Sequence, residues 1–261
     1  MGRGVALLAP LPQGERGAAT GATGGAEYFT GSEAMHPTAM YNGKLFFDTY
    51  AAKLGAGRVL DIGAQDVNGS LRAVCPASLT YTGVDFVPGK GVDVVLDDPY
   101  RLPFADNSVD AVVSSSCFEH AELFWVLFLE ILRVLKAPGL FYLNAPSNGA
   151  FHRYPVDCWR FYPDSGAALV KWAGRNGVDA YLLESYTSRQ NADIWNDFVA
   201  VFLKGSSHAP RFADRITSSF KDFSNGRVLD GEDFLNPKAY PEDLEKLRII
   251  SQLINNEVRL G

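Results

Sequence analysis

Val59-Leu60-Asp61-Ile62-Gly63 is a short apolar run that ends in an acidic residue and a glycine. The run predicts a buried strand over 58–62. Gly63 predicts a sharp turn directly after it, where the backbone can approach a ligand closely. Taken alone, Asp-x-Gly at a strand end is common in α/β proteins and predicts no more than a strand-to-loop turn. The residues that follow decide whether a ligand site lies here.

Further apolar runs alternate with helical patterns downstream of this turn. We expect strands over 80–84, 92–96, 109–114, 140–144, 178–184 and 198–203, and helices over 40–54, 122–136, 164–174 and 241–257. The segment between the first two strands is too short for a full helix, so we expect a shortened or irregular one there. Residues 205–238 are polar and are predicted to be irregular. The alternation indicates an α/β fold with a parallel sheet covered on both faces.

Length and composition limit how the chain can be divided into domains. The chain has 261 residues, 47% of them hydrophobic, which suffices for one large domain with appendages. Residues 1–26 are rich in Gly and Ala and predict a flexible N-terminal arm. A domain then spans 27–205, and 206–261 are expected to form a C-terminal extension ending in a helix packed on that domain.

Charge, cysteine and histidine patterns exclude several classes of protein. The net charge is −6, which disfavours nucleic acid as a partner. No apolar run is long enough to cross a bilayer, so no membrane association is expected. Three cysteines and four histidines show no paired metal-ligand spacing, so no metal site is predicted. The odd, scattered cysteines suit a reducing compartment and favour a cytoplasmic location.

Two further carboxylates follow predicted strands. Asp85 ends the second strand, about 20 residues after the glycine turn, where a carboxylate can accept hydrogen bonds from a ribose diol. Asp98 follows the third strand and could accept from the amine of adenine. Each alone could be a turn or helix-cap residue. Because parallel strands end at one sheet edge, all three acidic residues together predict a nucleotide-cofactor site.

The segment from Asp98 to Asp110 resembles a signature of class I S-adenosylmethionine-dependent methyltransferases. That family has an Asp, then Leu-Pro-Phe, then Asp-x-Ser-aromatic-Asp leading into a strand. Here the residues are Asp98, Leu102-Pro103-Phe104 and Asp106-Asn107-Ser108-Val109-Asp110, with Val109 in place of the aromatic residue. The stretches 114–120 and 132–140 are also similar to the family. The resemblance covers about 58–146.

The resemblance implies a Rossmann-like three-layer sandwich. Its seven-stranded, mostly parallel sheet would have the last strand antiparallel beside the fifth. S-adenosyl-L-methionine would be the cofactor. The cofactor-binding residues would be Asp61, Gly63, Ala64, Gln65, Asp85, Phe86, Asp98, Pro99 and Ser115. One departure is Gln65, which stands where the family usually has a second glycine and whose side chain could contact the cofactor.

The stretch 147–163, after the fifth strand, mixes His, Arg, Asp and aromatic residues at the same sheet edge. His152 is the first candidate for a general base, and His120 the second. Asp157 could orient a base or substrate, or pair with an arginine of its own loop. Each histidine could instead be structural. The aromatic side chains Trp159, Phe161 and Tyr162 could stack on a substrate ring or anchor the loop in the core.

The sequence therefore predicts an enzyme, a methyltransferase of class EC 2.1.1. Its substrate would be a small molecule carrying a hydroxyl or amine, with a sugar suggested by a resemblance of 152–161 to methyltransferases found with sugar-modifying enzymes. A homodimer is one assembly that we consider. Two alternatives stay open: a non-catalytic partner protein that keeps the fold, for which Gln65 is the one hint, and a dinucleotide-dependent oxidoreductase, although Gly-x-Gly-x-x-Gly is missing.

Overall fold

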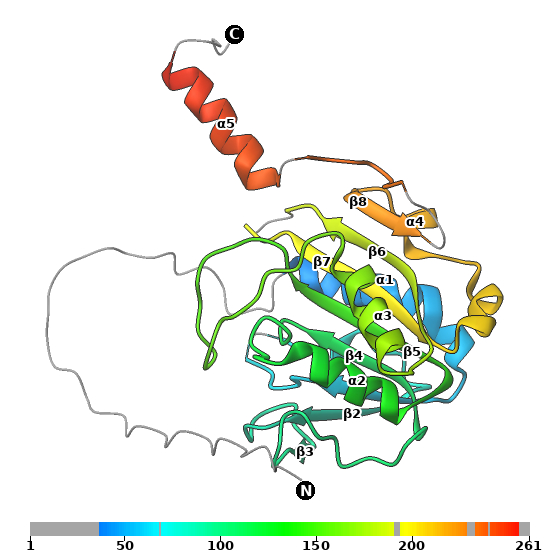
Figure 1. Ribbon diagram of the computed structural model, residues 1–261. Coiled ribbons are helices and arrows are strands. Elements are labelled where there is room, and N and C mark those ends of the chain that lie inside the picture. The colour runs from blue at the N-terminus through cyan, green and yellow to red at the C-terminus, as the bar shows by residue number, and fades with distance from the viewer. Residues whose placement is uncertain (1–36, 68, 191–193, 229–232, 240, 256–261) are drawn as a thin grey trace, which may run out of the picture. The chain divides into compact units, whose positions relative to one another are not determined.

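The computed structural model describes residues 37–67, 69–190, 194–228, 233–239 and 241–255. The predicted arm over 1–26 lies outside these residues. The described chain is built around one sheet of eight strands in the order β3-β2-β1-β4-β5-β7-β6-β8 (Figure 1). The strands are β1 Arg58–Ile62, β2 Thr80–Asp85, β3 Val94–Val95, β4 Val109–Ser115, β5 Leu135–Pro146, β6 Ala180–Ser188, β7 Asp197–Lys204 and β8 Phe223–Val228.

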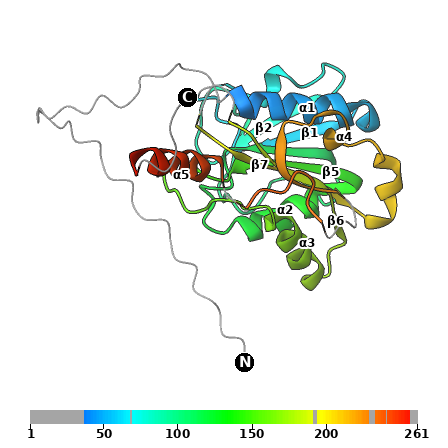
Figure 2. The same cartoon turned by 90° about the horizontal axis from the view of Figure 1, so that it is seen from above.

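Helices cover both faces of the sheet, as Figure 2 shows from above. On one face lie α1 (Pro37–Leu54), the 3-10 helix η2 (Ser206–Phe212) and α4 (Ile216–Ser219). On the other lie α2 (Phe124–Val134) and α3 (Ser165–Arg175). Side chains of a strand alternate between the faces. Val59 therefore packs with the α1 side, and Leu60 packs with the α2 side.

The predicted three-layer α/β fold is confirmed, including an antiparallel strand beside the fifth, since β7 pairs antiparallel with β5. The predicted number of strands is wrong, because β8 pairs with the far edge of β6 and makes eight. The expected shortened helix after the first turn is also confirmed. In place of an α-helix, the chain forms only the 3-10 turn η1 (Leu71–Ala73) before β2.

The prediction that 205–238 is irregular is wrong, because this segment contains η2, α4 and β8. Scattered apolar residues such as Phe212 and Ile216 are fully buried there, without a periodic pattern that sequence could show. The buried carboxylate of Glu184 in β6 holds the segment: it accepts the N–H groups of Ile216 at 2.8 Å and Thr217 at 3.0 Å. These two bonds satisfy donors at the start of α4 that no helical carbonyl reaches.

The end of α2 also differs from the prediction. The helix was expected to run over 122–136 and to be stopped by Pro138-Gly139, but α2 ends at Val134, and Leu135 already adopts an extended backbone with φ −65° and ψ 136°. Leu135 pairs with Val109 of β4, so strand pairing begins three residues before Pro138. Burial of Leu135 against the sheet outweighs the helical pattern of the sequence around it.

The last helix, α5 (Glu242–Ile254), was expected to pack on the domain. None of its described residues is buried. Its polar contacts are made by residues of its first turns: the backbone N–H of Gln190 donates to Glu242 at 3.0 Å, and the Asn148 side chain reaches Asp243 at 3.4 Å. Its large apolar residues Leu247, Ile250 and Ile254 are at least half exposed. No described helix combines the length and apolar character needed to cross a bilayer.

Candidate functional site

Three parallel strands, β1, β2 and β4, end at one edge of the sheet, because Asp61 is paired in register with Gly83 of β2 and with Val113 of β4. Gly63 follows β1 with a φ of 80°, a conformation that side-chain-bearing residues rarely adopt. A Cβ atom at Gly63 would lie 2.6 Å from Cβ of Cys117, which follows β4. Only glycine therefore lets the β1 turn approach the end of β4.

Asp61, the next-to-last residue of β1, is a buried carboxylate, and Tyr81 of β2 donates a hydrogen bond of 2.7 Å to it. Burial raises the pKa of Asp61 to about 6, although the Tyr81 hydroxyl opposes that shift. Proximity to Asp85 also raises this pKa, so the structure brings these two predicted site residues together.

Asp85 is fixed by the backbone but keeps capacity for a ligand. Its Oδ1 accepts the N–H of Val87 at 2.9 Å, and its Oδ2 lies 3.4 Å from the N–H of Gln65. Each carboxylate oxygen has two lone pairs, so each can accept one further hydroxyl. The next side chain, Phe86, is 46% exposed and offers an apolar ring beside this carboxylate.

The end of β3 joins the same edge, because the N–H of Leu96 donates to the carbonyl of Asp85 at 2.8 Å. Asp98 and Pro99 follow as exposed residues. Asp98 Oδ1 accepts the N–H of Tyr100 at 2.8 Å. This bond is typical of a turn residue, which was the alternative to a role in adenine recognition. Ser115, at the end of β4, is buried, and its hydroxyl lies 3.4 Å from the Asn144 amide.

Together these residues fit a nucleotide such as S-adenosylmethionine. The β1 turn lies against the end of β4 because position 63 has no side chain, the Asp85 carboxylate at the end of β2 keeps free acceptor capacity, and the exposed ring of Phe86 follows it. The turn's own donors are largely used: Gly63 and Ala64 both donate to the carbonyl of Val84, at 3.0 and 3.1 Å. The turn therefore offers a ligand little hydrogen bonding of its own, and the Asp85 carboxylate is the acceptor with free capacity beside it.

Gln65 links the turn to the loop after β5. Its Oε1 accepts a hydrogen bond of 2.9 Å from the Tyr154 hydroxyl. Its amide also fills space beside Gly89, where an added Cβ would approach the Gln65 Nε2 to 2.6 Å. Gln65, which replaces the family's second glycine, thus has a structural role in this chain. Tyr154 was not predicted, since nothing in the local sequence indicates a partner so distant.

The Leu102-Pro103-Phe104 segment has a structural partner in α2. Arg133 donates to the carbonyls of Leu102 and Phe104 at 3.0 and 2.9 Å. Glu130 accepts from Arg133 at 2.8 Å and also accepts the N–H of Leu102 at 2.7 Å. The motif that carried the family resemblance is therefore held in place by an ion pair on α2, which fixes the chain between β3 and β4.

The loop over 147–163 is braced by Asp157. Its carboxylate accepts from Arg160 at 2.6 Å and from the backbone N–H of His152 at 2.7 Å. The Arg160 guanidinium lowers the pKa of Asp157 to about 2, so the Asp157 carboxylate is ionised and stabilises the loop. Trp159 donates to the Ala121 carbonyl and packs with the core, whereas Tyr162 is 58% exposed.

Phe161 is a second anchor of this loop, because its ring is buried. It packs against the rings of Phe118, Phe124 and Phe198. Of the three aromatic residues considered for substrate stacking, two therefore anchor the loop.

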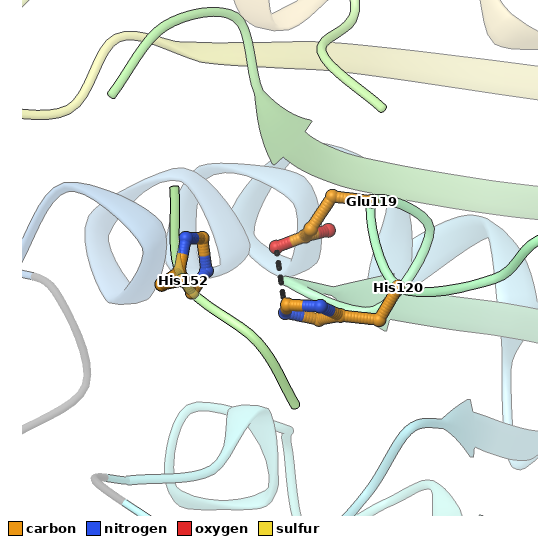
Figure 3. A group of neighbouring side chains, drawn as sticks. All are labelled: Glu119, His120 and His152. Atoms are coloured by element: carbon orange, nitrogen blue, oxygen red, sulfur yellow. Dashed lines mark ion pairs between the residues drawn. The ribbon is translucent and has the colours of Figure 1, made fainter. Parts of the chain in front are cut away.

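His120 and His152 lie together, with ring centroids 5.0 Å apart, beside the buried Glu119 (Figure 3). His120 Nδ1 is 2.5 Å from the Val156 carbonyl, and its Nε2 is 3.8 Å from Glu119 Oε1. Burial lowers the pKa of His120 and raises the pKa of Glu119 to about 8. Both predicted base candidates thus belong to one small cluster, together with Glu119, which the sequence did not indicate as a site residue.

Comparison with known proteins finds methyltransferases similar to part of this chain. A family described as a methyltransferase domain matches residues 52–143, from the end of α1 into β5. An uncharacterised methyltransferase of Mycobacterium avium is 35% identical over 95 residues, which cover 36% of this chain and 34% of that protein. The chain thus spans about a third of the length of the first curated relatives it matches.

Two other similarities reach further along the chain. A phthiotriol/phenolphthiotriol dimycocerosates methyltransferase of Mycobacterium tuberculosis is 26% identical and covers 68% of this chain and 66% of its own length. The structure of a Burkholderia thailandensis 1,6-didemethyltoxoflavin-N1-methyltransferase, with S-adenosylhomocysteine bound, has a TM-score of 0.48 and 15% identity. It covers 64% of this chain and 79% of that one. The chain thus resembles methyltransferases most clearly over residues 52–143, the segment that carries the strand-end carboxylates Asp61, Asp85 and Asp98.

Proposed function

We propose that this protein is a methyltransferase that binds S-adenosylmethionine against the β1 turn and the end of β2. The observation that carries the proposal is the Asp85 carboxylate, which two backbone N–H groups fix beside the exposed ring of Phe86. Asp85 would hold the ribose hydroxyls and Phe86 would cover the adenine. The bound cofactor would supply an electrophilic methyl group, so the protein must mainly align an acceptor and receive its proton.

The acceptor would lie between the turn and the loop over 147–163. Phe151 and Tyr154 of this loop are 76% and 51% exposed, and apolar ring faces of this kind stack on the flat face of a sugar. The neighbouring His152 or His120 would take the proton that a hydroxyl or amine loses. We therefore propose a small polar acceptor, with a sugar hydroxyl or amine as the first class to test and a lipid hydroxyl as the second.

Calorimetric titration of the purified chain with S-adenosylhomocysteine tests the cofactor site. We expect binding of one molecule per chain, lost or strongly weakened in Asp85→Asn and unchanged in Asp48→Asn, an exposed carboxylate on α1. If neither S-adenosylhomocysteine nor S-adenosylmethionine binds, the enzyme proposal fails and a non-catalytic partner protein is favoured. Binding of NAD or NADP instead would favour the oxidoreductase.

A second experiment tests the acceptor class. The protein is incubated with S-adenosylmethionine and separate pools of sugar nucleotides, free sugars and hydroxylated lipids, and mass spectrometry detects the gain of one methyl group. Methylation in the sugar pools supports the proposal. Methylation confined to the lipid pool would overturn the sugar assignment while leaving the methyltransferase intact.

A further inference from the structure

We infer that Glu119, His120 and His152 form a binding site for a single divalent transition-metal ion. One ligand atom from each of the three residues lies within 4.8 Å of the others (Figure 3). Glu119 and His120 follow β4, and His152 belongs to the loop after β5. The site therefore lies where these two neighbouring strands end.

The hydrogen bonds of the histidines identify which ring nitrogens are available. His120 Nδ1 faces the Val156 carbonyl at 2.5 Å, and His152 Nδ1 faces the Ala150 carbonyl at 3.1 Å. A carbonyl oxygen only accepts, so Nδ1 carries the hydrogen in both rings. Each Nε2 is then unprotonated and can coordinate a metal. A ring N–H donated to a carbonyl is also the usual way in which proteins orient histidine ligands.

Glu119 supplies the independent observation. Its side chain is almost fully buried, and its Oε2 has no hydrogen-bond partner among the described residues. A buried carboxylate oxygen without a partner is costly and calls for an explanation, such as an ion. The other oxygen, Oε1, faces His120 Nε2 at 3.8 Å, too far for a hydrogen bond. A cation bound by this carboxylate would give Oε2 a partner and would also lie between Oε1 and Nε2, two acceptors that cannot bond to each other.

The spacing suits one metal after small adjustments. Ligand atoms at about 2.0–2.1 Å from a tetrahedral ion lie roughly 3.4 Å from each other. The separation of 3.8 Å between Glu119 and His120 is close to this value. The His152 side chain is 41% exposed on its loop and has room to approach. Asp157, 3.5 Å from His152 Nδ1, would orient that ring from behind.

The ligand set selects the class of metal. Two imidazoles and one carboxylate favour Zn²⁺, Co²⁺ or Fe²⁺, whereas Mg²⁺ and Ca²⁺ prefer oxygen ligands only. Three protein ligands leave at least one position open for water or for an oxygen atom of a substrate. The sequence predicted no metal site because two of these ligands are adjacent and the third is remote, which matches no spaced motif.

Metal binding here does not depend on the proposed methyl transfer, but it changes the role of the histidines. One lone pair cannot both bind a metal and accept a proton. If a metal is bound, a hydroxyl coordinated at the open position becomes more acidic, and neither histidine serves as its base. Cofactor binding and metal binding can therefore be measured separately, and one can fail without the other.

Cobalt titration of the untagged, chelator-treated full chain tests the site. We expect one Co²⁺ per chain, with visible absorption bands of a four- or five-coordinate ion. We expect His152→Asn to weaken binding at least tenfold and Glu119→Gln to weaken it also. His208→Asn, in η2, is the matched control and should bind as the unaltered chain does.

Three results would overturn the inference: no stoichiometric binding, equal binding by His152→Asn, or a near-ultraviolet sulfur-to-cobalt band, which would place the ion on a cysteine. His152 lies on a half-exposed loop, so its variant should fold even if Glu119→Gln does not. Titration of His152→Asn with S-adenosylhomocysteine checks this, because that variant should keep the cofactor affinity of the unaltered chain.

Discussion

The hydroxyl of Tyr154 donates a hydrogen bond of 2.9 Å to the side chain of Gln65, and so ties the loop after β5 to the turn after β1. The two residues come from the two sides of the candidate site. The bond therefore fixes the spacing between the turn after β1, which would hold a cofactor, and the loop after β5, which would hold an acceptor.

Loss of the hydrogen bond between Tyr154 and Gln65 should make the loop more mobile. In Tyr154→Phe we expect amide hydrogen exchange over 150–156 to accelerate up to about tenfold, because a neutral hydrogen bond contributes about 1 kcal/mol. Hydrogen-exchange mass spectrometry measures this effect. Tyr162→Phe, an exposed tyrosine of the same loop, is the control and should exchange as the unaltered chain does. Equal protection in both variants would show that Gln65 does not hold the loop.

The Asp85 carboxylate should determine cofactor affinity. A hydrogen bond to a charged group contributes about 1.5–3 kcal/mol, so Asp85→Asn should weaken S-adenosylhomocysteine binding by roughly 10- to 100-fold. Isothermal calorimetry gives the ratio. A change of less than about twofold would place the ribose elsewhere and refute the site assignment.

The buried Asp61 should make stability depend on pH. Its pKa is about 6 in the folded chain against 3.8 ordinarily, so the folded state holds its proton more tightly. The stabilisation is complete below about pH 4 and is lost as pH rises through about 6. The full effect is about 3 kcal/mol. Urea unfolding at pH 4.5 and pH 7.5 should show a smaller pH dependence in Asp61→Asn than in Asp48→Asn; identical dependence would contradict the burial argument.

Arg133 should be more important for stability than its partial exposure suggests. Lysine cannot reproduce the planar fork that reaches two carbonyls and Glu130, so Arg133→Lys should lower the free energy of unfolding by about 1–3 kcal/mol. Chemical denaturation measures this loss. Arg175→Lys, at the end of α3, is the comparison and should change stability by less than about 0.5 kcal/mol.

The sequence predicted well those parts of the structure that local patterns encode. Buried strands such as β1 and β4 read as apolar runs, and Asp61 and Asp85 marked the strand ends correctly because parallel strands must end together. What it missed depends on distant contacts. The edge strand β8 is held by pairing with β6, and Tyr154 meets Gln65 across 89 positions. Glu119 becomes a candidate ligand only because the fold places it beside His152, which is distant in the sequence.

The order β5-β7-β6 has a consequence for any shortened form of this protein. The family match ends at residue 143, within β5, but β5 reaches β6 only through β7, which is completed at Lys204. A truncated chain ending after β5 would expose an unpaired, apolar strand edge of the kind that recruits other chains. A nascent chain has the same unpaired edge until Lys204 has been synthesised, so we expect the matched segment not to fold on its own.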